Sequence, residues 1–329
     1  MSLPLICPVC GQTLDQSNAE SIYCAACRTE YPQTLGIPDL RGPGAVTPEW
    51  DRAIVERMVA CYLQASFAVL LEIRLKGAPT FGDLLGHEAG YLVGHNARGT
   101  EMGKMFLARL AQYCGGSGAT TFALDLGCGQ GASLPTLARQ CRQVVGIDPS
   151  LPDLLLARKT LETSNLQNVQ LVQAYGQRLP FPDGSLDYVN ALNVFEHVFD
   201  LDAILGESFR VLRPGGRLAA DSRNRFDLFL PEPHVKVRWV GFMPRRWAKS
   251  YVGWRKKVGY DGTCLLSYAD LQRGLRRRFG KQYRIMFPHV SAYGGPAWVD
   301  WWLDRFERVP VLRDLLLWTF PSHLVLAWR

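Results

Sequence analysis

The chain has 329 residues, 47% hydrophobic and 20% charged, which is typical of a globular protein with one large domain and additions. Its formal net charge of +7 indicates an acidic partner or surface. We find neither a membrane-spanning apolar run nor a basic segment followed by an apolar core at the amino terminus. We therefore expect a cytoplasmic protein without a membrane span or secretory signal, and allow for peripheral membrane contact.

Residues 1–40 are predicted to form a module around a structural zinc ion. They contain two C-x-x-C pairs separated by thirteen residues, which is the spacing of a closed tetrahedral zinc site. So short a segment cannot build a stable core by itself, so the metal is expected to supply its folding energy. The predicted ligands are Cys7, Cys10, Cys24 and Cys27.

Residues 41–115 are predicted to be a linker followed by a helical cap. Apolar residues recur at helical spacing over 48–76, where Thr47 can cap the helix and Gly77 can end it. A second helix is expected over 100–113. Between them, Arg98 is either a surface loop residue or a partner for a ligand carboxylate.

Strands and helices alternate through the centre of the chain, which predicts a parallel sheet with helices on both faces. The fold class is therefore α/β, with a seven-stranded doubly wound, Rossmann-like sheet whose last strand is antiparallel. The predicted strands lie near 122–126, 143–147, 169–174, 186–193, 215–221, 282–287 and 323–328.

A glycine turn follows the first of these strands. Gly127 and Gly129 let the backbone approach a ligand, and Gly131 opens a helix. Asp148, at the tip of the next strand, has the spacing of a carboxylate that binds ribose hydroxyls. The glycine pattern also fits a dinucleotide fingerprint. However, Asp125 would repel a pyrophosphate and can face an ammonium group, which favours S-adenosylmethionine.

Three downstream blocks keep the order and spacing of one family, so residues 122–221 resemble the class I S-adenosylmethionine-dependent methyltransferases. The blocks are 179–187 (Leu-Pro-Phe-Pro-Asp-Gly-Ser-Leu-Asp), 196–198 (Glu-His-Val) and 211–217 (Val-Leu-Arg-Pro-Gly-Gly-Arg). The resemblance implies a cofactor-binding core at 116–222. The residues expected to bind the cofactor are Asp125, Gly127, Cys128, Gly129, Gly131, Asp148, Pro149, Tyr175, Gly176, Gln177, Asn193 and Arg98.

The chain departs from the family where an acid commonly accepts a hydrogen bond from the adenine amino group. The frequent Gly-Asp-Ala is Ala-Tyr-Gly here, with Tyr175 in place of the acid. Tyr175 could stack on the ring, or Gln177 and backbone groups could replace the acid. Residues 31–40 also resemble the tail of the small zinc-ribbon domain that accompanies many methyltransferases.

Residues 223–263 are predicted to be a substrate lid over the carboxyl ends of the strands, and 264–329 to complete the sheet. Between Glu232 and Asp261 no acidic residue occurs, while lysines and arginines alternate with aromatic residues. Such arginines could hold a phosphate or carboxylate of the acceptor, or anionic lipid headgroups.

The expected reaction is methyl transfer to oxygen, for which a histidine could act as general base. The candidates are His197, beside Glu196, and His234 in the lid. Three functions remain open: a methyltransferase for a small-molecule, lipid-linked or glycan-linked acceptor; an RNA base methyltransferase; and a non-catalytic scaffold. The block at 193–196 reads Asn-Val-Phe-Glu and lacks a base-clamping Asn-Pro-Pro-Tyr, which disfavours RNA.

Overall fold

The computed structural model describes residues 3–16, 21–77, 121–198, 200–232, 235–257, 260, 263–293 and 295–329. The helix expected over 100–113, together with Arg98 and His234, lies outside these residues. In the parts of the chain that are described, no helix is long and apolar enough to cross a bilayer.

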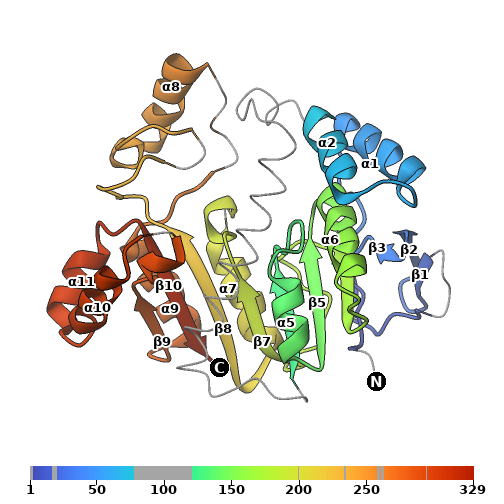
Figure 1. Ribbon diagram of the computed structural model, residues 1–329. Helices are drawn as coiled ribbons and strands as arrows, with labels where there is room; N and C mark the ends of the chain where they lie inside the picture. Colours follow the sequence, from blue (N-terminus) through green and yellow to red (C-terminus); the bar gives the residue numbers. More distant parts are fainter. Residues whose placement is uncertain are drawn as a thin grey trace.

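A seven-stranded sheet forms the centre of the molecule, as predicted (Figure 1). Its strand order is β6-β5-β4-β7-β8-β10-β9. The first five strands in this order are parallel, and β10 runs antiparallel to both of its neighbours. The strands are β4 (Phe122–Leu126), β5 (Gln143–Asp148), β6 (Val169–Gln173), β7 (Leu186–Ala191), β8 (Leu212–Arg223), β9 (Tyr283–Met286) and β10 (Ser322–Trp328).

Alternating side chains of the parallel strands enter two separate cores, because successive residues of a strand point to opposite faces. In β4, Leu124 and Leu126 pack in one core and Ala123 in the other. The first core is covered by α7 (Leu201–Val211) and α9 (Tyr268–Phe279), and the second by α5 (Leu134–Gln140) and α6 (Leu151–Thr163).

The helix predicted over 48–76 is two helices, α1 (Glu49–Cys61) and α2 (Phe67–Gly77), which pack against each other and against α6. The prediction of one continuous helix was therefore wrong. Thr47 does not cap α1 either, because its hydroxyl accepts a hydrogen bond from Arg41 Nη2 at 2.9 Å and the N-cap is Pro48.

The last part of the chain adds α8 (Arg245–Lys256), α10 (Ala297–Phe306) and α11 (Pro310–Leu317). Short 3-10 turns are η1 (Phe195–His197), η2 (Val240–Phe242) and η3 (Val290–Tyr293). In Figure 1, α8 lies beyond the end of the sheet to which the parallel strands point, whereas α10 and α11 flank β9.

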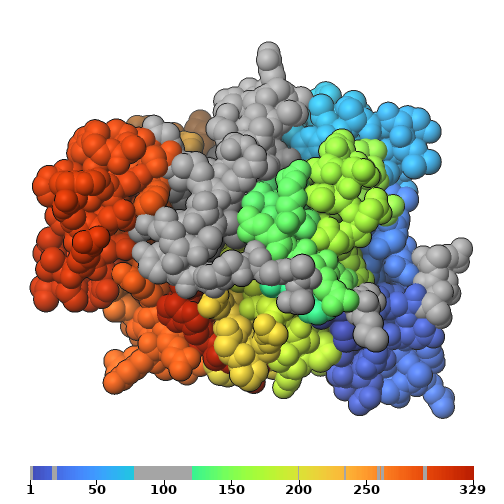
Figure 2. Space-filling view, turned by 60° about the horizontal axis from the view of Figure 1, so that its bottom comes forward, coloured from blue at the N-terminus to red at the C-terminus, as the bar shows by residue number. Residues whose placement is uncertain are grey.

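The amino-terminal module fills a place on the sheet where a crossover helix is usual. The connection between β6 and β7, residues 174–185, contains no helix, although parallel strands are commonly joined by one. The three-stranded sheet β1 (Ser21–Cys24), β2 (Thr29–Thr34) and β3 (Ile37–Pro38) lies there instead. Its apolar side chains share one core with Val145, Ile147 and Val172, and Figure 2 shows the module (blue) against the flank of the sheet domain.

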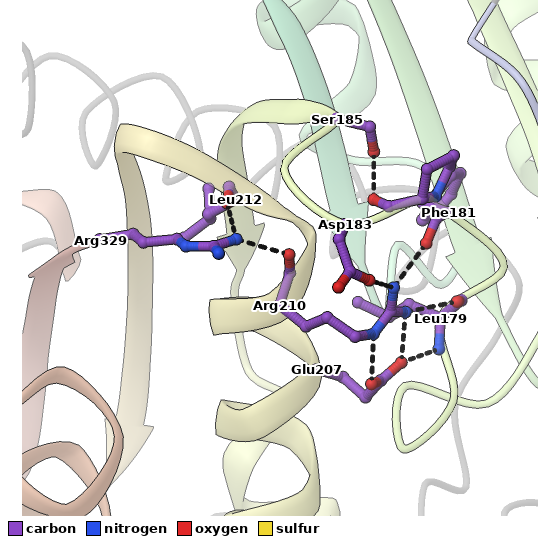
Figure 3. Close-up of polar contacts among 9 residues, drawn as sticks. Leu179, Phe181, Asp183, Ser185, Glu207, Arg210, Leu212 and Arg329 are labelled. Atoms are coloured by element: carbon purple, nitrogen blue, oxygen red, sulfur yellow. Dashed lines mark hydrogen bonds and ion pairs between the residues drawn. The ribbon is translucent and has the colours of Figure 1, made fainter.

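Arg210, in the last turn of α7, holds the long connection before β7 (Figure 3). Its guanidinium donates to the carboxylates of Glu207 and Asp183 at 2.7 Å, and to the carbonyl oxygens of Leu179 and Phe181 at 2.9 and 2.8 Å. Since residues 174–185 lack a helix, these bonds replace the internal hydrogen bonds that a crossover helix would provide.

We expect Arg210→Ala to lower the free energy of unfolding by about 3 kcal/mol, because several charge-assisted hydrogen bonds are lost and buried carbonyl groups lose their donor. Chemical denaturation followed by circular dichroism measures this. Arg139→Ala, an exposed arginine of α5 with one long bond to its own helix, is the matched control and should change stability by less than about 0.5 kcal/mol. Equal effects of both substitutions would contradict the assignment.

Candidate functional site

The four predicted metal ligands come together in the amino-terminal module. The Sγ atoms of Cys7, Cys10, Cys24 and Cys27 all lie within 4.8 Å of one another, and two of these distances are 3.5 and 3.4 Å. Tetrahedral zinc with four thiolates needs sulfur–sulfur distances of about 3.8 Å. The cluster therefore fits a zinc ion, and four protein ligands would leave no coordination position for a substrate.

The glycine turn after β4 has the backbone shape that the sequence suggests. Gly127, Gly129 and Gly131 have φ angles of +66°, +48° and +80°, a region that disfavours other residues. A Cβ on Gly127 would lie 2.6 Å from Val194, and one on Gly131 would lie 3.0 Å from Ala157. A Cβ on Gly129 would meet no atom of the described residues within 4 Å, so this glycine presents bare backbone to open space.

Asp148 lies beside that open backbone at the carboxyl end of β5. Its carboxylate accepts hydrogen bonds from the backbone N–H groups of Gly129 and Ser150, at 3.0 and 2.8 Å. Burial, with the nearby charge of Asp153, raises the pKa of Asp148 to about 7. A carboxylate has four acceptor positions, so two remain for vicinal hydroxyl groups such as those of ribose.

The raised pKa of Asp148 predicts that nucleoside binding depends on pH. Hydroxyl groups bind an ionised carboxylate more strongly, and the ionised fraction grows as pH rises through about 7. We expect affinity for S-adenosylhomocysteine to fall by at most about tenfold from pH 7.5 to pH 6. Calorimetric titration at both pH values measures this. The dependence should vanish in Asp148→Asn, and persistence there would assign it to another group.

The sequence predicts that Asp125 faces a ligand, whereas in the structure its side chain is buried and is bound by other side chains of the protein. Its buried carboxylate accepts hydrogen bonds from Ser133 Oγ at 2.6 Å and Asn190 Nδ2 at 2.7 Å, and burial raises its pKa to about 6. These bonds join β4, the start of α5 and β7. Asp125 therefore holds the glycine turn in place, and contact with a ligand ammonium group stays a prediction.

Tyr175 lies on the surface after β6, next to the tail of the amino-terminal module. Leu40 N–H donates to the carbonyl oxygen of Gln173 at 2.7 Å, which fixes this tail to the end of β6. Arg41 donates to both carboxylate oxygens of Asp39, at 2.9 and 2.7 Å. Asp39 and, more weakly, Tyr175 raise the pKa of Arg41. The module thus contributes side chains to the edge of the expected adenine pocket.

A cavity of about 240 Å³ opens between this tail, α1, the start of α6 and the end of β6. Its lining includes both charged tail residues, so the amino-terminal module shapes the surface beside the candidate cofactor site. The lining includes Asp39, Arg41, Thr47, Leu151 and Gln173.

The loop after β7 carries the candidate base. Asn193 adopts a left-handed φ of +53°, and its N–H donates to the buried carboxylate of Asp221 in β8 at 2.5 Å. His197 follows in η1 with an exposed side chain, whereas Glu196 is buried. The structure therefore places Asn193 and His197 at the carboxyl edge of the sheet, and their predicted roles remain untested.

The other predicted cofactor residues have different surroundings. Pro149 and Gln177 are exposed at the ends of β5 and β6. Cys128 is buried, and its Sγ would lie 3.0 Å from a Cβ added at Gly146, so the thiol faces the sheet. A Cβ on Gly176 would lie 2.6 Å from Ile204 Cδ1 and 2.8 Å from Leu126 Cδ1, so packing disfavours a larger residue there.

Sequence reasoning missed several residues of this region, which are Ser133, Asn190, Asp221, Asp39 and Arg41. Asn190 and Asp221 could have been identified from sequence, because each is a polar residue inside a largely apolar strand. Asp39 and Arg41 could not, since the docking of the module brings them to the end of β6.

Comparisons with known proteins support the cofactor core. Residues 124–220 match the family model described as a methyltransferase domain. The chain is 32% identical over 133 residues to the ubiquinone biosynthesis O-methyltransferase of Bradyrhizobium sp. (strain ORS 278), covering 38% of this chain and 51% of that protein. It is 40% identical over 97 residues to the demethylmenaquinone methyltransferase of Thermus thermophilus, covering 29% and 44%.

Among solved structures, phosphoethanolamine N-methyltransferase 2 of Haemonchus contortus aligns with a TM-score of 0.45 and 17% identity, covering 68% of this chain and 52% of that one. The chain spans about half or less of the length of the two curated relatives above. Residues 124–220 therefore match a methyltransferase domain, and this match does not include residues 1–40.

Proposed function

We propose that the protein transfers the methyl group of S-adenosylmethionine to an acceptor. The pairing of Asp148 with the N–H group of Gly129, at 3.0 Å beside open backbone, is the observation that carries this proposal. The match of residues 124–220 to a methyltransferase domain supports it. When bound, S-adenosylmethionine supplies an electrophilic methyl group on a sulfonium sulfur.

The residues of the chain would act mainly by positioning. Asp148 would accept hydrogen bonds from the ribose hydroxyls, and the glycine turn, held by Asp125 through Ser133, would admit the ligand to the backbone. Orientation of this kind supplies much of the rate of a bimolecular transfer. Arg98 and Tyr175 are proposed as further contacts, to a carboxylate and to adenine.

We propose that the acceptor atom is oxygen, on a small or lipid-linked molecule. The name of the ubiquinone biosynthesis O-methyltransferase supports oxygen, and the names of both relatives support a quinone-like, lipid-linked molecule. In this transfer the carbon–sulfur bond breaks with its electron pair moving to sulfur, a carbon–oxygen bond forms, and the hydroxyl proton leaves. His197 and His234 are the proposed acceptors of that proton.

We propose that the protein is organised in the five segments predicted from sequence, which are residues 1–40, 41–115, 116–222, 223–263 and 264–329. In this proposal the zinc-binding module supports the cofactor site, the core binds S-adenosylmethionine, and the lid receives the acceptor. The core of the module is continuous with that of the sheet, which supports the first of these roles.

Incubation with S-adenosylmethionine carrying a labelled methyl group, together with lipid, polar and RNA extracts in separate tubes, tests the proposal. Label in the lipid or polar fraction, absent with Asp148→Ala, is the expected result. Label in RNA alone would indicate that the acceptor is a nucleic acid. If the protein binds the cofactor but no fraction is labelled, a non-catalytic scaffold would be favoured.

A further inference from the structure

The lid contains a small folded unit with its own apolar core. Five buried side chains between the end of β8 and the end of α8 pack together, apart from the cores of the sheet. Arg225 fixes this unit to β8 by donating to the carbonyl oxygens of Gly241 and Met243 at 2.8 and 3.0 Å. The outer surface of the unit is therefore held in a defined orientation. The five side chains are Val235, Val237, Val240, Ala248 and Val252.

Helix α8 turns two tryptophans and several cations outward. Trp247 and Trp254 are seven residues apart, which places them on one side of a helix, and they are 59% and 77% exposed. Only Ala248 and Val252 of the helix are buried. The sequence has no acidic residue between Glu232 and Asp261. The exposed basic residues of α8 and its C-cap are Arg245, Arg246, Lys249, Arg255, Lys256 and Lys257.

Further exposed apolar side chains lie on a loop that contacts the lid unit. Leu228, Phe229 and Leu230 are 48%, 58% and 48% exposed. The loop adjoins the lid unit, because Arg238 Nη1 donates to the carbonyl oxygen of Phe229 at 2.8 Å. Three consecutive exposed apolar side chains are uncommon on the surface of a protein unless they bind a partner. We call the outward residues of α8 together with Leu228–Leu230 the lid surface.

The lid surface lies at the end of the molecule where an acceptor must arrive. The lid unit follows β8, and α8 stands beyond the carboxyl ends of the parallel strands (Figure 1). Those ends also carry Asp148 and the glycine turn. A partner bound to the lid surface would therefore meet the protein at the same end of the sheet as the proposed methyl-transfer site.

We propose that the lid surface docks the protein on an anionic membrane, from which a lipid-linked acceptor enters the site. Tryptophan prefers the membrane–water interface, and lysine and arginine are attracted to anionic headgroups. RNA binding would use the cations and the aromatic rings, but it would leave Leu228 and Leu230 exposed without function. The acceptor route rests on the proposed methyltransferase function, whereas docking itself does not.

Flotation of the full chain with phospholipid vesicles tests the docking. Binding to vesicles with about 30% phosphatidylglycerol is expected, with at least about tenfold less bound to pure phosphatidylcholine or in high salt. Trp247→Ala with Trp254→Ala, and separately Arg246→Glu with Lys257→Glu, should each reduce binding by about tenfold or more. Arg246 lies over the ring of Trp247, and Lys257 follows Trp254 by three residues at the end of the helix. The control is Trp50→Ala in α1, a tryptophan 39% exposed outside the lid, which should bind as the wild type does.

Equal binding to both kinds of vesicle, no binding, or an undiminished response in both double variants would overturn the proposal. Tight binding of a structured RNA that is lost in the charge-reversal variant, without vesicle binding, would assign the surface to nucleic acid. Titration with S-adenosylhomocysteine separates the two proposals. Vesicle binding without cofactor binding would refute the proposed function alone, and cofactor binding without vesicle binding would refute the docking alone.

Discussion

Replacing Cys24 with serine is expected to destabilise the whole protein and not only its first forty residues. The substitution removes one of four thiolates from the cluster that fits zinc, and a module of this size depends on its metal for folding. The module covers a face of the sheet that lacks a crossover helix. Its unfolding would therefore expose apolar side chains of β5 and β6 to water.

The expected size of this effect follows from what the module buries against the sheet. Full burial of one large apolar side chain contributes about 1.5–3 kcal/mol, so loss of the module should lower the free energy of unfolding by more than about 5 kcal/mol. The melting temperature should then fall by at least about 10 °C. The buried module side chains in the shared core include Leu3, Leu5, Leu14, Ile22, Tyr31 and Leu40.

Calorimetric melting of the zinc-loaded protein, the chelator-treated protein and Cys24→Ser measures this prediction. Cys61→Ser is the matched control, because this cysteine ends α1 and, among the described residues, its thiol bonds within that helix alone. It should melt within about 2 °C of the wild type. A chelator-treated protein with an unchanged melting temperature would show that the cluster does not stabilise the fold through a metal.

Replacing Asp148 with alanine is expected to weaken binding of S-adenosylmethionine and S-adenosylhomocysteine by about tenfold to a hundredfold. Hydrogen bonds to a charged group contribute about 1.5–3 kcal/mol each, and the variant would lose those to the ribose. The N–H of Gly129 would also lose its acceptor, which loosens the turn that meets the ligand. Both losses act in the same direction.

Titration calorimetry of the wild type, Asp148→Ala and Asp183→Ala tests this prediction. Asp183 is an exposed carboxylate in the connection before β7 that binds Arg210 and should leave cofactor affinity unchanged. Melting curves establish that each variant is folded. Affinity of Asp148→Ala within about threefold of the wild type would contradict the ribose contact, since that contact should exceed 1 kcal/mol.

The sheet was predictable because its strands are short apolar runs bounded by turns. The runs predicted near 122–126 and 143–147 lie within one residue of β4 and β5, and the antiparallel last strand is also confirmed. The glycine turn and Asp148 were predictable for the same reason, since the strand positions fix where the turn must lie. Local sequence determined these features.

The break between α1 and α2 was missed because residues 62–66 contain neither glycine nor proline. Tyr62 hydroxyl donates to Glu162 of α6 at 3.1 Å, and the two helices fold back on that helix. The one local signal is Ser66, whose Oγ accepts a long hydrogen bond from Val69 N–H at 3.4 Å. The position of the break depends mainly on tertiary packing, which cannot be inferred from the spacing of apolar residues along the sequence.

The docking of the amino-terminal module was also beyond sequence reasoning. The absent crossover helix was visible as a short connection at 174–185, but what covers the sheet there depends on contacts between residues far apart in the chain, such as Leu40 with Gln173. The bonds of Asp125 to Ser133 and Asn190 were not predicted, because these partners are 8 and 65 residues away. Buried polar networks of this kind become visible only in three dimensions.

Calorimetric titration of the zinc-loaded wild-type protein with S-adenosylmethionine and S-adenosylhomocysteine tests the central claim most directly. Micromolar binding of both, at one site per chain, is the predicted result. Absence of binding by a folded, zinc-loaded protein would contradict the claim, and would show that a turn with Tyr175 in place of the usual acid no longer holds the cofactor.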